Sequence, residues 1–469
     1  MPTTWRPHLD RPFRLDDLLL FAVFLTLPLE GMGLLKRAHA GAGFAGGLTF
    51  AKIFILLALA AWAVRTIVSQ DQYLLRALFG IKTTLFLMGS LLVAFSTLVQ
   101  TKIRPYFSQF FVQAVSLFLL YLLIVGVVQA RTRVFQWALA ALLIGTIPSS
   151  LGGVYEALTG HLIMKGRVQT PLGPEALTQQ RGLYKSESGR YRIASFSGDC
   201  GIHGVHWAVY GPMSMAVPFL FRRRWLKVAG WGFVMLTVVN CLGTGTRTGM
   251  GSLLFGVLAF FALAKIPHKP QIAAAAIVAA LVLGIMMGAP LERILGKEHK
   301  AETSTAWRFA MTKIAIQMIE DHPILGVGVG NYVGLYYKYC EKVPEANRTP
   351  VIMHNGYLAV WSEQGTLGLI CFLGFFGSVA LDLFRTVRRP ASRYIHFAAA
   401  GLLGGLVAHL ITQLGYPLLG DELGYWLMGF GVTITELNRR LHGEYPFRGM
   451  AQESTWSSEP GALPAAVPA

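Results

Sequence analysis

Long apolar stretches alternate with short polar segments along most of the chain, and twelve of these stretches have membrane-spanning length. They predict helices at 18–35, 48–68, 78–98, 108–129, 134–152, 206–221, 228–243, 249–264, 271–289, 356–382, 395–415 and 422–437. A helix satisfies its own backbone hydrogen bonds inside the hydrocarbon core of a membrane. We therefore predict an all-α polytopic membrane protein with about 12 transmembrane helices.

Two long connections on the outer side, which we expect to contain short helices, divide this series. The predicted parts are helices one to five over 1–152, a first loop over 153–205, helices six to nine over 206–289, a large loop over 290–355, helices ten to twelve over 356–440, and a tail over 441–469. The tail is rich in Ser, Pro and Ala, so we predict that it is disordered on the cytoplasmic side.

Composition excludes several classes of protein. Of the 469 residues, 54% are hydrophobic and only 14% are charged, and the mean hydropathy is +0.50. Soluble domains carry about 25% charged residues, so a soluble enzyme, a secreted disulfide scaffold and a disordered chain are excluded. The 51 glycines and 12% aromatic residues are also unlike an outer-membrane barrel. The four cysteines form no CxxC pair, so the sequence holds no zinc or redox motif of that kind.

The distribution of charge predicts the orientation. A net charge of +17 would suggest nucleic acid in a soluble protein, but here Lys and Arg mark the cytoplasmic side, and we expect no nucleic-acid partner. With the N-terminus in the cytoplasm, every second connection is short and basic. The residues that fall inside are Arg65, Arg76, Arg131, Arg133, Arg222, Arg223, Arg224, Lys227, Lys265, Lys269, Arg385, Arg388, Arg389, Arg393, Arg439 and Arg440. Both termini are therefore predicted to be cytoplasmic.

The predicted spans lack the chain of Asp, Glu and Lys residues that ion-coupled carriers usually hold inside the membrane. The two halves of the chain also show no matching repeat. We therefore expect the chemistry at the outer face. A twelve-helix transporter or flippase, favoured by the helix count alone, and a scaffold that binds anionic lipid through basic loops stay open as alternatives.

Two arginine-bearing segments are candidates for binding an anion. In Thr244-Gly-Thr246-Arg247-Thr-Gly, a tight turn opens a helix, Thr246 or Thr248 can cap it, and its first N–H groups with Arg247 suit an anion. An ordinary turn carrying an exposed arginine is the alternative.

The second segment, 190–199, holds Arg190 and Arg192, and arginine forms paired hydrogen bonds with phosphate. Asp199 would hold one arginine or contact a sugar hydroxyl. His203 and His206 are spaced for a metal, but a third ligand is missing from the neighbouring sequence, so we predict none.

His354 is the candidate general base. It precedes Asn355, a good N-cap, at the start of the tenth predicted span. The positive end of the helix dipole disfavours a cationic imidazole, so His354 would stay neutral and able to accept a proton. A structural histidine at the membrane surface is the alternative.

The large outer loop carries a helical pattern from about Thr303 that presents Arg308 and ends at Gly326, Gly328 and Gly330. These glycines allow the backbone to approach a ligand or another element closely, and Tyr332 follows them. Each long loop also holds one cysteine, Cys200 or Cys340, and an oxidising compartment would permit a bridge between them. Whether it forms stays open.

Taken in order, these motifs resemble the O-antigen ligase/polymerase family of bacterial envelope glycosyltransferases. The resemblance covers roughly 190–375 and rests on Arg192-Ile-Ala-Ser-Phe, Thr244-Gly-Thr-Arg247, Arg308, His322-Pro-Ile-Leu-Gly-Val-Gly-Val-Gly-Asn-Tyr332, His354-Asn355 and Glu363-Gln-Gly-Thr-Leu-Gly368. The turn has Thr where the family often has Ser. The stretch Gly198-Asp-Cys200 replaces an Asn-Pro-Asn-like run of many relatives, which bears on the preferred acceptor.

The resemblance implies an inverting, metal-independent and cofactor-free glycan transfer at the periplasmic face of the bacterial inner membrane. The donor would be a glycan on undecaprenyl diphosphate. The acceptor would be a sugar hydroxyl of lipid A-core for a ligase, or of a second lipid-linked glycan for a polymerase. A flippase of the lipid-linked glycan is the alternative.

Under this resemblance, His354 takes the acceptor proton while Arg192 and Arg247 hold the diphosphate. The further candidates for binding the diphosphate or sugar are Arg190, Arg308, Thr246, Asp199, Asn355 and Tyr332. Membrane lipids are the remaining expected partners, because the isoprenoid tail of the donor would lie against the helices.

Overall fold

The computed structural model describes residues 13–29, 50–68, 78, 81–97, 104–128, 131–161, 163, 192–197, 199–221, 223–266, 299–343, 353–417 and 421–443. All regular structure in these ranges is helical. The elements are α1 (Leu15–Thr26), η1 (Leu27–Leu29), α2 (Phe50–Val68), α4 (Lys82–Ser96), α5 (Arg104–Val128), α6 (Thr132–Thr159), η3 (Ser195–Ser197), α8 (Cys200–Leu220), α9 (Arg224–Gly243), α10 (Arg247–Leu263), α13 (His299–Asp321), α14 (Asn331–Cys340), α15 (Gly356–Arg388), α16 (Arg393–Thr412) and α17 (Glu422–Leu441).

Each predicted span coincides in sequence with a helix of the structure, except the span at 271–289, which lies outside the described residues. By length and composition, α2, α6, α9, α15 and α16 are able to cross a membrane. The prediction of a helical, multi-pass membrane protein is therefore confirmed at this level.

Several helix ends differ from the hydropathy boundaries. Helix α6 continues to Thr159 rather than 152, and α8 begins at Cys200 rather than 206. Helix α1 ends at Thr26, because Pro28 supplies no N–H to continue it and the chain tightens into η1. Within the predicted large loop, α13 and α14 are regular helices.

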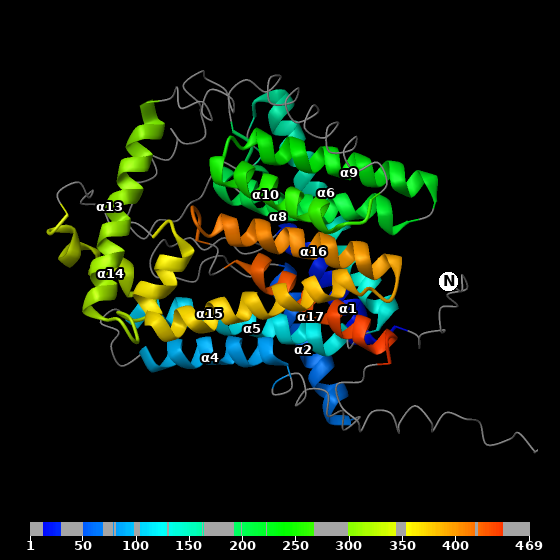
Figure 1. Cartoon of the computed structure of the whole chain (residues 1–469), viewed down its shortest axis with the longest axis horizontal. Coiled ribbons are helices and arrows are strands. Elements are labelled where there is room, and N and C mark those ends of the chain that lie inside the picture. The colour runs from blue at the N-terminus through cyan, green and yellow to red at the C-terminus, as the bar shows by residue number, and fades with distance from the viewer. Residues whose placement is uncertain are drawn as a thin grey trace, which may run out of the picture.

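Most helices run alongside one another in a bundle, and α13 stands across one end of it with α14 beside it (Figure 1). Helix α8 packs between α9, α10 and α16, while α15 packs on α4 and α16. Large buried side chains such as Trp207, Trp426 and Phe430 fill the main core. A separate small core, with Met311 and Tyr336 fully buried, joins α13 and α14 to the start of α15.

The helix termini define two ends of this bundle. At one, α6 and α16 begin together, with the rings of Phe135 and Tyr394 6.4 Å apart. We call it the basic end, because the described residues that the charge pattern assigns to the cytoplasm lie there. At the other, which we call the site end, α8, α10, α15 and α17 begin and α6, α9 and α16 finish.

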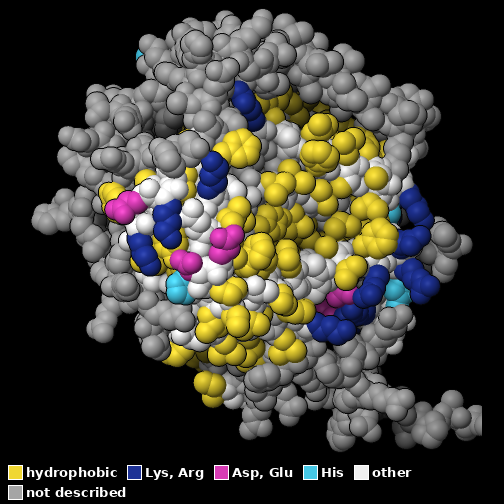
Figure 2. Space-filling view, turned by 60° about the vertical axis from the view of Figure 1, so that its left-hand side comes forward, with side chains coloured by type: hydrophobic (Ala, Val, Ile, Leu, Met, Phe, Trp, Pro, Cys, Tyr) yellow, Lys and Arg dark blue, Asp and Glu magenta, His cyan; other side chains and the backbone are white. Residues whose placement is uncertain are grey.

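The surface between these ends is apolar. Figure 2 shows a broad hydrophobic face with charged side chains gathered at its two sides. Large apolar side chains of α4 and α15 are exposed, among them Leu92, Phe95 and Ile370 at 55% or more. An apolar surface of this breadth is unusual in water and is what contact with lipid requires.

Candidate active site

Arg192 is fixed at the site end by the turn that precedes α10. Its Nε donates a hydrogen bond to the carbonyl oxygen of Thr244 at 2.6 Å, and its Nη2 donates to Oγ1 of Thr246 at 3.2 Å. Ile193 N donates to Gly243 O at 3.1 Å. These bonds bring Arg192 to the turn that carries Arg247, although the two arginines are far apart in the sequence.

A buried carboxylate holds the backbone next to Arg192. Glu156, 2% exposed in the last turn of α6, accepts hydrogen bonds from the N–H groups of Ala194 at 2.7 Å and Ser195 at 2.8 Å. Its other oxygen accepts from Ile163 N at 2.8 Å. Ser195 has a positive φ of 48°, which this set of bonds maintains. Sequence reasoning missed Glu156, whose only signal is a lone acid at the end of an apolar helix.

Thr246 occupies the N-cap position of α10, but its side chain does not cap the helix. Its hydroxyl donates instead to the carbonyl oxygen of Cys200 at 3.1 Å and accepts from Arg192. Gly245, with φ +61°, makes this turn possible, because a side chain there would be strained. The predicted capping role is thus replaced by a contact that positions Arg192.

His354 is placed by the end of α16. Oδ1 of Asn355 caps α15 by accepting from Leu358 N at 3.1 Å, as the sequence predicts for an N-cap. Gly356 N donates to the carbonyl oxygen of Gln413 at 2.7 Å. A Cβ at Gly356 would lie 2.0 Å from Oε1 of Gln413, so any larger residue there would require the Gln413 side chain to move.

Two aromatic rings flank the His354 imidazole. The ring centroid of Trp307 lies 5.6 Å from that of His354, and the centroid of Tyr416 lies 6.4 Å away. Trp307 comes from α13 and Tyr416 from the connection after α16. The imidazole is therefore held between two elements that are distant in the sequence.

Arg308 lies in the same neighbourhood, next to Trp307 on α13. Although its side chain reaches the surface, partial loss of water around it and the like charge of Arg247 lower the pKa of Arg308 below its ordinary value. Tyr416 lies close enough to act on it in the opposite direction. Arg247 and Arg308 are therefore near neighbours that both carry positive charge.

Asp199 completes the cluster. It caps α8 by accepting from Ile202 N at 2.9 Å, and the Tyr416 hydroxyl donates to its Oδ1 at 3.5 Å, the long limit of a hydrogen bond. Burial and this carboxylate raise the pKa of Tyr416 well above its usual range, so the phenol keeps its proton. Sequence reasoning missed Tyr416, which is marked only by its place between Gly415 and Pro417.

The structure thus brings together seven of the predicted site residues: Arg192, Asp199, Thr246, Arg247, Arg308, His354 and Asn355. Tyr332 lies elsewhere, in the small core, where it is 2% exposed and its hydroxyl donates to Met311 O at 3.2 Å. Arg190 lies outside the described residues.

A family model described as O-antigen ligase matches residues 232–373. Residues 232–373 are thus similar to the O-antigen ligase family. The matched range runs from α9 into α15 and includes Arg247, Arg308 and His354, so the resemblance inferred from the motifs is confirmed. None of the curated proteins compared with the chain matches it. The O-antigen ligase match supports glycan transfer of the ligase or polymerase type by a membrane enzyme.

Arg192 and Tyr416 lie outside the matched range, yet they contact residues within it: Arg192 bonds to Thr244 and Thr246, and the ring of Tyr416 lies beside that of His354. Gly415 supports this contact, because a Cβ there would lie 2.6 Å from Oγ1 of Thr248 in α10. The segments that flank the matched range therefore complete the cluster.

The glycine segment of the matched range, from Gly326 to Gly330, packs against α15. Gly365, with φ +64°, kinks this helix, and the backbone of 324–328 fits against the kink. Gly328 N donates to Glu363 O at 2.9 Å, and Val327 N donates to Ser362 O at 2.8 Å. The sequence predicted that these glycines allow close approach either to a ligand or to another element, and the structure shows the approach to another element.

The two histidines of α8 have different partners. His203 Nε2 lies 2.9 Å from Oδ1 of Asn240, and His206 Nε2 lies 2.6 Å from Oδ2 of Asp421. Although burial opposes it, the pairing with His206 holds the pKa of Asp421 below its ordinary value. Within the described ranges, no three His, Cys, Asp or Glu side chains are grouped to hold a metal.

The two loop cysteines are not joined. Cys200 at the start of α8 and Cys340 at the end of α14 are both buried, and neither forms a disulfide. The bridge that the sequence left open is therefore absent from this structure.

Proposed function

We propose that the protein transfers a glycan from undecaprenyl diphosphate to a sugar hydroxyl at the periplasmic face of the bacterial inner membrane. The observation that carries the proposal is the cluster of Arg192, Arg247 and Arg308 beside His354 at one end of an apolar bundle. Guanidinium groups bind phosphate oxygens in pairs, and a diphosphate needs positive charge both when bound and when leaving.

The proposed reaction is a single displacement at the anomeric carbon. The acceptor hydroxyl loses its proton to His354, and its oxygen forms the new glycosidic bond as the bond to the diphosphate breaks. The diphosphate leaves with the electron pair, and the arginines stabilise its added negative charge. Attack opposite the leaving group inverts the anomeric configuration, and the step uses no metal or cofactor.

The surroundings of His354 support its role as the base. The rings of Trp307 and Tyr416 pack near the imidazole and limit its movement, and the hydrogen bond from Gly356 to Gln413 fixes the start of its helix. A fixed base removes the proton more efficiently than a mobile one. We also propose that the Asp199 carboxylate, which lies near Tyr416, accepts a hydrogen bond from a sugar hydroxyl.

The acceptor decides between two forms of this function. Lipid A-core as acceptor gives a ligase, which we favour because the matched family model is that of a ligase. A second lipid-linked glycan as acceptor gives a polymerase. Neither form requires a different arrangement of the arginines and the base.

Purified protein in liposomes, given carrier-linked glycan and lipid A-core, tests the proposal. We expect one added product step for a ligase and a ladder for a polymerase. His354→Ala should lower the transfer rate about 10²–10⁴-fold, the usual contribution of a general base. His161→Ala, which changes an exposed histidine at the site end, is the matched control and should keep the parent rate.

Arg192→Lys and Arg247→Lys should also lose most activity, because an ammonium group cannot form paired bonds to phosphate. Movement of the lipid-linked glycan across the bilayer without a new glycosidic bond would instead support a flippase. Near-parental transfer by folded His354→Ala would remove the proposed base.

A further inference from the structure

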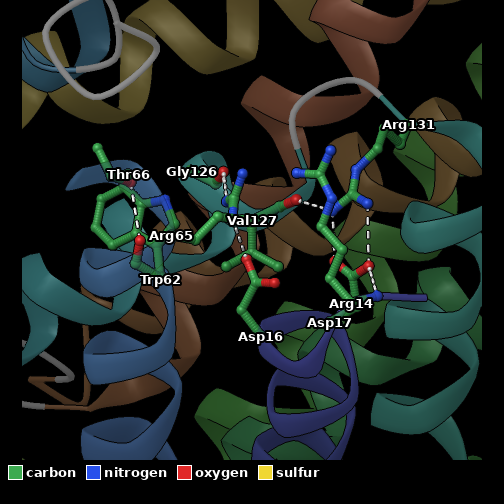
Figure 3. Close-up of polar contacts among 9 residues, drawn as sticks. All are labelled: Arg14, Asp16, Asp17, Trp62, Arg65, Thr66, Gly126, Val127 and Arg131. Carbon is green, nitrogen blue, oxygen red and sulfur yellow. Dashed lines mark hydrogen bonds and ion pairs between the residues drawn. The ribbon is translucent and has the colours of Figure 1, made fainter. Parts of the chain in front are cut away.

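A second group of arginines lies at the basic end, where α1, α2, α5 and α6 meet (Figure 3). Two aspartates lie among these arginines. We call the whole set the α1 cluster, and its members are Arg14, Asp16, Asp17, Arg65, Arg131 and Arg133. Arg131 precedes the first turn of α6, whereas Glu156 lies in the last turn. Twenty-five residues of helix separate them, about 37 Å at 1.5 Å per residue. The α1 cluster is therefore distinct from the candidate active site.

Two of the arginines are tied to buried acids. Arg65 Nε lies 2.9 Å from Oδ2 of Asp16, and Arg131 Nη1 donates to Oδ2 of Asp17 at 3.0 Å. The two carboxylates are 2% and 0% exposed. Arg131 also donates to the carbonyl oxygen of Val127 at the end of α5. These bonds fasten four helix ends together, since a buried carboxylate requires a cation.

Among the described residues, the α1 cluster nevertheless carries excess positive charge, because it holds four arginines and two aspartates: Arg14, Arg65 and Arg131 lie around Asp16 and Asp17, and Arg133 lies over the ring of Phe13. Figure 3 shows the guanidinium group of Arg14 beside that of Arg131. Partial burial and the like charges of Arg131 and Arg65 lower the pKa of Arg14 below its ordinary value, despite the nearby aspartates. An added anion would relieve this repulsion.

An apolar strip leads away from the α1 cluster. The guanidinium carbon of Arg133 lies 4.5 Å above the ring of Phe13, whose edge contacts Trp137 at 6.3 Å between centroids. Trp137, Ile144 and Leu151 recur every seven residues on α6 and are 52%, 52% and 55% exposed. Tryptophan at the head of such a strip is typical of the level at which lipid headgroups lie.

We propose that the α1 cluster binds the phosphate of an anionic phospholipid, with Arg14 and Arg133 as its main ligands and the acyl chains along the exposed strip of α6. Basic groups at the cytoplasmic ends of transmembrane helices attract anionic headgroups. A soluble phosphate would match the charge but would leave the strip uncovered. The bound lipid would strengthen the junction of the four helix ends.

Thermal unfolding of the full chain in detergent tests this proposal. Short-chain phosphatidylglycerol should raise the unfolding midpoint about 5 °C more than phosphatidylcholine with the same acyl chains. The double variant Arg14→Gln, Arg133→Gln should lose most of this difference and bind phosphatidylglycerol at least about tenfold more weakly. Arg133→Gln alone, which changes an exposed side chain, should lose part of it.

The matched control is Arg223→Gln, Arg224→Gln, which removes the same charge from exposed positions at the start of α9. It should respond to phosphatidylglycerol as the parent does. Equal stabilisation by the two phospholipids, an equal stabilisation by inorganic phosphate that the Arg14→Gln, Arg133→Gln variant loses, or equal loss in the control would each overturn the proposal.

Discussion

Tyr416 joins two groups that are proposed to act in transfer. Its ring contacts His354, and its hydroxyl donates to Asp199. The ring contact should matter more than the hydroxyl bond, which at 3.5 Å is long. Tyr416→Phe should therefore keep the transfer rate within about threefold, whereas Tyr416→Ala should lower kcat about 10–100-fold by freeing the imidazole.

Steady-state transfer rates at several pH values would check this expectation. A positioning role lowers kcat and shifts the pH profile of the base, while the KM of the donor changes little. Tyr337→Ala, which removes an exposed ring from α14, provides the control. A Tyr416→Ala variant with an unchanged kcat would contradict the role.

Asp421 ties the start of α17 to α8 through His206. Because its pKa is lowered in the folded state, its contribution to stability is full above the ordinary value near 4 and is lost as the pH falls through the lowered value. Asp421→Asn should therefore lower the free energy of unfolding by ~1–3 kcal/mol at pH 7.

Thermal unfolding from pH 7 to pH 3 would measure this contribution. The difference in unfolding midpoint between the parent and Asp421→Asn should become smaller below about pH 4. Asp382→Asn, which changes surface pairs with Arg385 and Arg439, should cost at most about 1 kcal/mol. A difference in unfolding midpoint that stays constant with pH would show that the Asp421 carboxylate does not stabilise the folded protein as an anion.

At the scale of single helices, the kink of α15 joins α13 and its Arg308 to the helix of His354. A Cβ at Gly365 would overlap the carbonyl of Ile324 and would impose a left-handed backbone on a residue with a side chain. Gly365→Ala should cost at least ~1–2 kcal/mol from the backbone alone and more from the overlap. The unfolding midpoint and the transfer rate should both fall.

Gly377 offers the comparison within the same helix. A Cβ there would meet nothing within 4 Å, so Gly377→Ala should be neutral or stabilising by up to about 1 kcal/mol. Equal effects of the two substitutions would mean that the kink is not specifically required.

Hydropathy located the helices because burial in lipid depends on composition, but it could not locate their ends. Helix α6 continues beyond its apolar stretch because the Glu156 carboxylate there accepts hydrogen bonds from three backbone N–H groups. Helix α8 starts early because Asp199 caps it. Both causes lie in tertiary or side-chain contacts that a window average does not register.

The candidate site could be predicted only in part, because local sequence features mark some of its residues and tertiary contacts place the others. Arg247 and His354 were found because they open helices, where local physics favours anions and neutral imidazoles. Tyr416 was not found, because its partner Asp199 is 217 residues away. Tyr332 was assigned to the site from its motif, although its ring fills the small core.

At the scale of the whole molecule, the positive charge at one end predicts the orientation. Short basic connections stay in the cytoplasm, so the site end should face the periplasm. A membrane-impermeant maleimide should label His161→Cys in intact spheroplasts and should label Arg224→Cys only after permeabilisation. The native cysteines Cys200, Cys241 and Cys340 are buried and add little background. The reverse pattern would invert the topology.

The crowding of Arg247 and Arg308 has a practical consequence. Two like charges on separate helices repel each other, and a doubly charged anion bound between them would offset this repulsion. Heat resistance should then report occupancy directly, and inorganic pyrophosphate would serve as a simple surrogate where the polyprenyl-linked sugar is too scarce to titrate. A phosphate-containing buffer would accordingly be the gentler choice for purification.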